Sequence, residues 1–316
     1  MINNRIVTIL QALVLMILFS LGTIFAKMVL ADISPFTFSW VSIGIGLIVL
    51  GSYTFVIRKE RIPKNLGKEV WLMIIALGVC NHILSKTIRP FALRSLPVIT
   101  TTYLGNFVGF VTMAMSSILL KEYPYLFQLI GAGIAILGIN LYFGEPLQSG
   151  ELIGIVLISI NILLIAFTNN VSRKLAIVKS KDLSANMIAS TSLLIGGSGI
   201  VLAGMIFDFP PEVPDMRSWV ILIYSGIVNI GLGGIVWNHI LQTMRSFEAS
   251  ILGASTIIFT TLLAIIILKE FPTTSQWLGM GTMLLGLILV QIRKGSLASL
   301  FRKKGKTKLD IDPDEI

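Results

Sequence analysis

Long apolar stretches alternate with short polar or proline-containing segments along almost the whole chain. A bilayer core is about 30 Å thick, and a helix needs roughly 20 apolar residues to cross it. Reading each stretch between its helix breakers, we expect ten transmembrane helices, near residues 6–30, 35–57, 70–88, 96–119, 124–143, 151–171, 183–207, 217–241, 247–268 and 273–292. The predicted fold class is therefore all-α, a polytopic membrane protein without a separate soluble domain.

Composition indicates that the bilayer is the solvent of this chain. Of its 316 residues, 54% are hydrophobic and 13% are charged, whereas soluble domains carry roughly 25% charged residues. The net charge of +9 comes from short clusters between apolar stretches and from the end of the chain. That is the pattern of membrane topology and not of a nucleic-acid surface. We expect membrane lipids as partners and no nucleic acid.

The loops that carry Lys and Arg predict how the chain lies in the membrane. Basic residues are concentrated in segments 58–68 and 173–181 and after residue 292, and such segments of membrane proteins stay in the cytoplasm. We therefore expect a plasma-membrane protein, in a bacterial inner membrane, with both termini cytoplasmic. Three basic residues disagree with this arrangement, because it places them on the opposite side: Lys86, Arg89 and Arg94.

An internal repeat is visible at an offset of 148 residues. The segment Leu120-Lys121-Glu122-Tyr123-Pro124 aligns without a gap with Leu268-Lys269-Glu270-Phe271-Pro272. The same offset places Gln128, Gly131, Gly133 and Gly138 on Gln276, Gly279, Gly281 and Gly286. Apolar composition alone does not align charged residues, proline and glycines. We expect two homologous repeats, at 1–148 and 149–296, followed by a cytoplasmic tail at 297–316 that is predicted to be disordered.

Each predicted repeat contains five helices. Because this number is odd, the second repeat must enter the membrane from the opposite side, so the repeats are inverted. Inverted repeats are a recurring transporter design, in which the two halves open a central site alternately to each face. We expect such a site between the halves, lined by helices one, three, four, six, eight and nine.

The end of each repeat also carries a family resemblance. In segments 119–138 and 267–286, an apolar helix runs into a Lys-Glu turn, which is followed by Gln-x-x-Gly and further glycines. With these motifs the sequence resembles the EamA family of the drug/metabolite transporter superfamily over nearly its whole length. The resemblance implies ten helices, cytoplasmic termini, a cavity between the halves and export of amino acids, metabolites or toxic compounds. Many relatives have an arginine in the second helix, whereas this chain has none at residues 38–42, so an acidic substrate is less supported.

Candidate binding residues are polar side chains at mid-membrane depth, because a polar group in hydrocarbon is costly unless it faces protein or water. They are Asn81, His82, Tyr103, Asn106 and Asn229. Trp237 is the candidate for the cavity wall, with the interfacial aromatic belt as its alternative. For the amides, the alternative is that they pair between helices as structural contacts worth about 0.6 kcal/mol each.

Two residues are candidates for coupling or gating. His82 can change charge near neutral pH, which suits proton coupling or a pH-sensitive gate; a neutral, hydrogen-bonded core histidine is the alternative. Glu248 is predicted at the start of a helix, where an acid also favours the helix dipole without any role in transport. The string Asn-His-Ile-Leu at 81–84 recurs at 238–241, an offset of 157 instead of 148, and is either a pseudo-symmetric pair or a coincidence.

These features together predict a secondary transporter, an exporter of amino acids or related small metabolites that works by alternating access around a midplane cavity. The alternative is a lipid-translocating or non-transporting membrane partner subunit. An enzyme is not expected, because the chain has 2 His and 1 Cys and lacks H-E-x-x-H, G-x-S-x-G and the Walker sequence. Neither a metal nor a cofactor is predicted. The expected partner is a small-molecule substrate, while proton coupling and a homodimer are left open.

Overall fold

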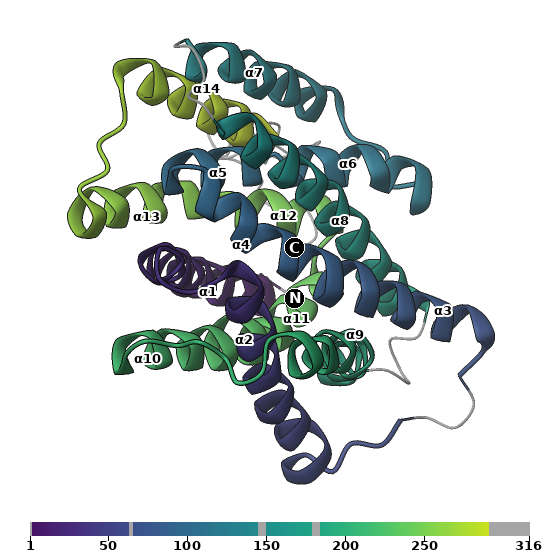
Figure 1. Cartoon of the computed structure of the whole chain (residues 1–316). Helices are drawn as coiled ribbons and strands as arrows, with labels where there is room; N and C mark the ends of the chain where they lie inside the picture. The colour runs from purple at the N-terminus through teal and green to yellow at the C-terminus, as the bar shows by residue number, and fades with distance from the viewer. Residues whose placement is uncertain (1, 63–65, 145–149, 179–183, 291–316) are drawn as a thin grey trace, which may run out of the picture.

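The computed structural model describes residues 2–62, 66–144, 150–178 and 184–290, and within these ranges it contains helices and connecting turns but no β-strand (Figure 1). The predicted tail at 297–316 lies outside the described residues. The helices of the first half are α1 (Ile2–Val29), α2 (Pro35–Gly51), η1 (Ser52–Ile57), α3 (Lys68–Leu77), η2 (Gly78–Ser85), α4 (Lys86–Ser95), α5 (Val98–Gly105), α6 (Val108–Leu119) and α7 (Leu126–Tyr142). The elements labelled η are π-helical segments that continue a neighbouring α-helix.

The second half has a similar order of elements, except that it has no counterpart of η1 and has an additional π-helical segment, η4. Its elements are α8 (Glu151–Val178), α9 (Ala185–Phe207), α10 (Met216–Tyr224), η3 (Ser225–Leu232), α11 (Gly233–Thr243), α12 (Ser246–Gly253), α13 (Thr256–Leu263), η4 (Ala264–Leu268) and α14 (Thr274–Val290). The expected all-α class is confirmed for the described part of the chain, and the halves form a two-repeat layout.

Eight helices of the described chain are long and apolar enough to cross a membrane. The helices α7 and α14 are apolar but shorter, with 17 residues each, and at 1.5 Å per residue they reach only about 25 Å. Within the described residues, the prediction of ten spanning helices therefore holds for eight, while the described parts of α7 and α14 are apolar helices shorter than this length. The chain is a multi-pass membrane protein.

Two predicted helix ends were wrong by a full turn or more. The helix predicted at 70–88 continues without interruption to Ser95, through Pro90, and the one predicted at 151–171 continues to Val178. Proline has no N–H to donate to the carbonyl four residues earlier, which here belongs to Lys86. The Ser39 hydroxyl of α2 donates to that carbonyl instead, at 3.3 Å, as neighbouring helices do where membrane helices contain proline.

Capping side chains fix several helix starts. Ser34 precedes Pro35 at the start of α2 and accepts a hydrogen bond from the Thr37 N–H, which satisfies one of the unpaired donors of a first turn. Asp215 does the same for α10 by accepting from the Ser218 N–H at 2.7 Å. Hydrogen bonds from Ser218 hold the pKa of the Asp215 carboxyl below its ordinary value.

Irregular backbone features recur at the predicted offset of 148 residues. The fourth helix of the first repeat is interrupted between α5 and α6, and its equivalent is interrupted between α12 and α13. The π-helical segments η2 and η3 also correspond. Lys121 and Lys269 both have positive φ, 55° and 56°, in the turn that the repeated motif predicts. The sequence repeat is therefore a repeat of backbone conformation.

The glycines of the repeated motif form the contact between α7 and α14, which run side by side at one edge of the molecule (Figure 1). A Cβ atom on Gly131 would lie against the Gly286 carbonyl oxygen, and one on Gly138 would lie 2.9 Å from that of Gly279. Only glycine allows two backbones to approach so closely. Gly133 and Gly281 lie on other faces, where a Cβ would meet no atom within 4 Å.

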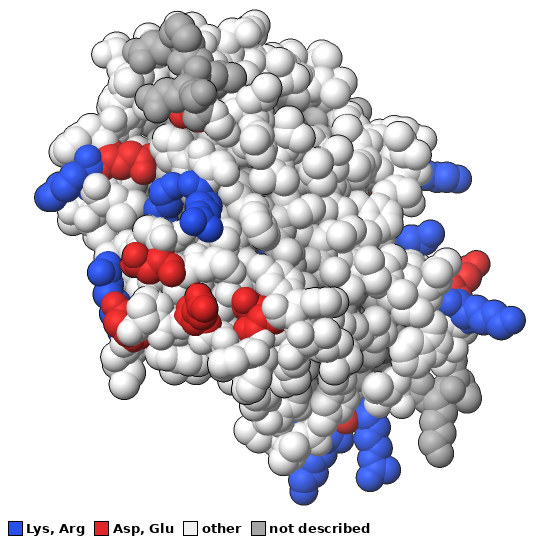
Figure 2. All heavy atoms as spheres, in the orientation of Figure 1, with Lys and Arg blue, Asp and Glu red and all other residues white. Residues whose placement is uncertain are grey.

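The outer surface is apolar over wide areas. In Figure 2 the charged side chains form two groups, one over the left of the visible face with both acids and bases, and one along its right and lower side where Lys and Arg predominate, with uncharged surface between them. Large apolar side chains such as Ile118, Ile206 and Phe207 are among the most exposed of the described residues. Contiguous exposed apolar surface of this extent is typical of lipid contact.

Candidate functional site

A cavity of about 290 Å³ lies between the two repeats. Its lining comes from α1, from η2 and α4, from α5 and α6, from α8, from η3 and α11, and from α12 and α13. These elements are the six helices expected to line a central site. The helix α2 also contributes, through Phe38, Ser39, Ser42 and Ile43.

Five of the predicted site residues line this cavity: Asn81, His82, Asn106, Asn229 and Trp237. They come from three different spans, so the fold brings together side chains that are far apart in sequence. Glu248 is not part of the lining and lies, largely buried, in the first turn of α12. Whether any of these residues binds solute or couples ions stays a prediction.

Tyr103 does not line the cavity, so its expected place there was wrong. Its side chain is fully buried and stacks on Tyr142 of α7, with ring centroids 3.9 Å apart. The neighbouring residue Thr102 lines the cavity instead. Depth along a helix was predicted from the sequence, but the face of the helix was not, and Tyr103 lies on the face that packs against α7.

Asn81 and Asn229 are equivalent residues of the two repeats, because they are separated by 148 positions and lie in η2 and η3. Asn229 packs directly over Gly22 of α1, where a Cβ atom would overlap its amide. Its Oδ1 atom has no hydrogen-bond partner in the described chain. The cavity therefore has one amide from each repeat at corresponding positions.

This pairing resolves the recurrence of Asn-His-Ile-Leu as a coincidence. The residue equivalent to Asn81 is Asn229 and not Asn238, and His239 is exposed and outside the cavity lining. His82, by contrast, is buried, and its Nε2 atom lies 3.5 Å from the Ser192 hydroxyl. Its Nδ1 atom has no partner among the described residues.

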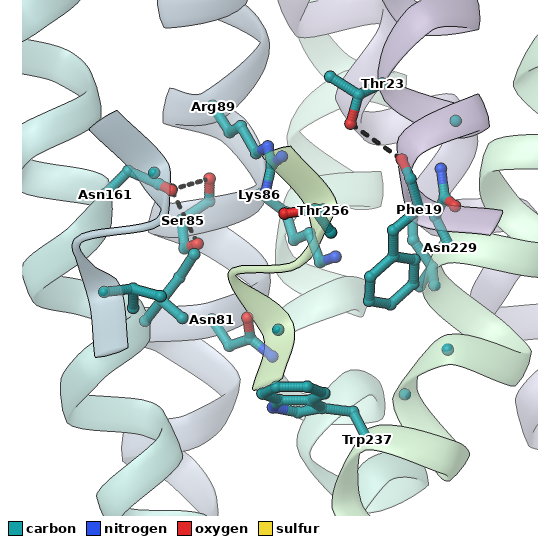
Figure 3. Close-up of a pocket in the computed structure, with 18 of the residues that line it drawn as sticks. Phe19, Thr23, Asn81, Ser85, Lys86, Arg89, Asn161, Asn229, Trp237 and Thr256 are labelled. Atoms are coloured by element: carbon teal, nitrogen blue, oxygen red, sulfur yellow. Dashed lines mark hydrogen bonds between the residues drawn. The ribbon is translucent and has the colours of Figure 1, made fainter. Parts of the chain in front are cut away.

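Lys86 and Arg89 are the cavity residues that sequence reasoning missed. Both lie on α4 and line the cavity, and their spacing of three residues places them on one helix face. Figure 3 shows them between Ser85 and Asn161 on one side and Thr23 and Asn229 on the other. The signal was present in the sequence, because these cations contradict the predicted topology. The helix predicted at 70–88 places Lys86 in its last turn and Arg89 just beyond its end, on the outer side of the membrane.

Side-chain hydrogen bonds hold the charged segment in place. Asn161 of α8 donates from Nδ2 to the Ser85 carbonyl at 2.8 Å and to the Ser85 hydroxyl at 2.9 Å (Figure 3). Trp237 donates from Nε1 to Asn169 Oδ1 at 2.9 Å, which fixes the indole in the wall. Ser85, Asn161, Asn169 and Trp237 all line the cavity, so these hydrogen bonds join lining residues to one another.

Two sets of hydrogen bonds lie at one end of the cavity, one within the first repeat and one between the two repeats. Lys27 of α1 donates from Nζ to the Leu93 and Leu96 carbonyls, at 2.8 and 2.7 Å, at the end of α4. Glu270 accepts from the Val98 N–H at 3.1 Å and the Ile99 N–H at 2.8 Å, at the start of α5. A cation at helix-terminal carbonyls and an anion at helix-terminal N–H groups are both favourable.

A related cluster lies at the other end of the span formed by α5 and α6, just beyond the end of α6. Arg173 of α8 donates from Nη1 to the Leu241 and Gln242 carbonyls at the end of α11, both at 3.1 Å. Leu93 and Leu241 are 148 positions apart, so Arg173 contacts the helix end that corresponds to the one bound by Lys27. Glu122 lies 3.8 Å from Arg173 Nε, and burial raises the pKa of the Glu122 carboxyl although Arg173 partly offsets the effect.

Arg89 and Trp237 also occupy equivalent positions, because they too are 148 residues apart and both line the cavity. The two repeats therefore agree in backbone and in the amides Asn81 and Asn229, but they differ in the larger side chains that face the cavity.

Comparison with known proteins agrees with the fold and the repeat. The model of the EamA-like transporter family matches residues 6–144 and 152–292, once in each half of the chain. No curated protein matches the sequence. A solved crystal structure of a protein, 15% identical in sequence, aligns over 95% of this chain and 98% of its own with a TM-score of 0.65, which shows likeness of fold alone.

Proposed function

The chain belongs to the EamA-like transporter family, and on this premise we propose that it is a secondary transporter that moves a small metabolite across the membrane by alternating access. The observation that carries the proposal is the cavity between the repeats, which is lined by polar side chains from both halves. Polar residues at membrane depth mark solute pathways, because a polar side chain that faced lipid would be costly. Alternating access then follows from two inverted repeats around one central site.

The proposal includes repeat boundaries at 1–148 and 149–296, a location in the plasma membrane, cytoplasmic termini and the export of amino acids or related metabolites.

The related clusters at the two cavity ends support this proposal. In each cluster a cation from the first helix of one repeat contacts the end of the third helix, and a glutamate from the other repeat lies nearby. Alternating access requires that the cavity can be closed at either end, and matched contacts at the two ends suit this requirement.

Transport by the purified protein in liposomes tests this function. Asn81→Ala and Asn229→Ala remove the equivalent amides from the cavity, and we expect each to reduce saturable uptake of an amino-acid and organic-acid panel on the order of tenfold. Asn140→Ala is the matched control, because Asn140 is exposed on α7 and does not line the cavity. Normal folding with no flux of any soluble member of the panel, but with movement of labelled lipid, would replace the solute carrier by a lipid translocator.

A further inference from the structure

The charge of the cavity lining is one-sided. Lys86 and Arg89 line the cavity, whereas no Asp or Glu is found among the described residues that line it. Neither cationic side chain has an ion pair or hydrogen bond within the part of the chain that the structure describes. The cavity therefore presents two positive charges without a protein counter-charge.

The cations at the cavity ends are arranged differently. Lys27 is bonded to the carbonyls at the end of α4, and Arg173 is bonded to the carbonyls at the end of α11 and paired with Glu122. Both of those cations are bound by groups of the protein itself. Lys86 and Arg89 stand out because they lie in an apolar span, where a charged residue is costly, yet they face open space.

From this charge we propose that the transported solute is a small organic anion, held by Lys86 and Arg89. The inference rests on the proposed transport function and names its substrate class. The planar guanidinium of Arg89 can bind a carboxylate or phosphate with two parallel hydrogen bonds, and the Lys86 ammonium adds a second, more compact charge. An ammonium group on a solute would meet no carboxylate in the described lining. Among the amino acids and related metabolites of the proposed function, this favours acidic metabolites over neutral amino acids and cations.

The remaining lining supplies the other contacts that such a solute needs. Asn106 Nδ2 and Asn229 Oδ1 have no partner in the described chain, so they can bind hydroxyl or carbonyl groups of the solute. The Trp237 indole is fixed by Asn169 and offers an apolar face. A solute with an anionic end and a polar or apolar remainder is complementary to this arrangement.

Binding of named probes to the purified full-length protein tests the inference. Succinate and inorganic phosphate are the anionic probes, alanine is the zwitterion and choline is the cation, each titrated by calorimetry. We expect an anionic probe to bind best, and Lys86→Gln and Arg89→Gln each to weaken it on the order of tenfold or more. Arg94→Gln is the matched control, because Arg94 lies on the same helix but is exposed and outside the lining.

The outcomes separate this inference from the proposed function. Anion binding that depends on Lys86 and Arg89, without flux in liposomes, would support the anion site and reject transport. Equal binding of alanine or choline, unchanged binding in both variants, or no binding of either anionic probe would overturn the anion site, whatever the flux. Binding of short-chain phosphatidylglycerol in place of both soluble anions would also overturn it, and would identify a lipid headgroup as the occupant.

Discussion

Glu270 and Glu122 occupy equivalent positions in the two repeats, but their carboxylates have different partners. Glu270 accepts hydrogen bonds from the Val98 and Ile99 N–H groups at the start of α5. The residues that correspond to Val98 and Ile99, 148 positions later, start α12, yet Glu122 does not bind their N–H groups. It is paired with Arg173 at 3.8 Å, and its Oε2 atom has no partner in the described chain.

This difference predicts that Glu270 stabilises the state seen here and that Glu122 does not do so in the same way. Loss of a helix-capping acceptor costs about 1 to 2 kcal/mol, which changes the ratio of two states by roughly five- to thirtyfold. In a Cys80→Ser background, we expect Glu270→Ala to speed thiol labelling of Ala26→Cys, which lies in the cavity lining beside Lys27. Labelling is measured as a rate in liposomes.

The matched variant is Glu122→Ala, with Ser172→Cys as the reporter beside Arg173. We expect a smaller change in labelling for this pair, because Glu122 has no bond to the start of α12 to lose. Equal acceleration at the two ends would show that the unequal contacts of the two glutamates do not bias the conformation.

A second prediction concerns His82. If this buried residue carries a coupled proton, His82→Gln keeps a polar side chain but removes the titratable group. We then expect solute flux to continue while its increase with an imposed pH gradient disappears. His239→Gln is the control, because His239 is exposed and outside the cavity lining. A gradient response that survives His82→Gln would leave the residue with a structural role only.

A third prediction concerns the α7–α14 contact. In Gly286→Ala the new methyl group would lie against the Gly131 carbonyl oxygen, so the helices must move apart, at roughly 1 to 3 kcal/mol. Gly281→Ala on the same helix gains the same helix propensity and meets open space. We expect a lower melting temperature for Gly286→Ala than for Gly281→Ala in the same detergent. Equal melting temperatures would contradict the close contact.

A fourth prediction concerns the hydrogen bonds between Asn161 and Ser85, which line the cavity next to Lys86. Asn161→Leu keeps the approximate side-chain volume but removes both bonds to Ser85, and we expect a loss of stability of about 1 to 3 kcal/mol. Because Ser85 immediately precedes Lys86, anion binding should weaken as well. Ser159→Ala on α8 serves as the control, since its hydroxyl bonds only within its own helix. Unchanged anion binding in a destabilised Asn161→Leu protein would show that these bonds stabilise the fold but do not position Lys86.

Much of the fold could be predicted from the sequence, because the repeated motif reports local backbone geometry. The same turn occurs at Lys121 and at Lys269 because the motif is repeated, and glycine at 131 and 286 is a residue type that permits close contact between helices. These features depend on near neighbours in the chain or on the repeat itself.

The site was harder to predict, because its residues are placed by contacts between distant segments. Pro90 was read as lying beyond a helix end, since the Ser39 hydroxyl that compensates for it belongs to another helix. Ending that helix at residue 88 placed Lys86 and Arg89 at the membrane boundary instead of in the cavity. Tyr103 was placed at the correct depth but on the wrong face, because the sequence does not contain the position of Tyr142.

The equivalence of Arg89 and Trp237 gives the cavity a direction. A pseudo-symmetric backbone that carried identical side chains in both repeats would accept a solute equally well in either of two opposed poses. Here one repeat offers a guanidinium where the other offers an indole, so a solute with a charged head and an apolar tail has one preferred pose. Such a solute would keep the same heading throughout the transport cycle and would leave the protein without having to turn around.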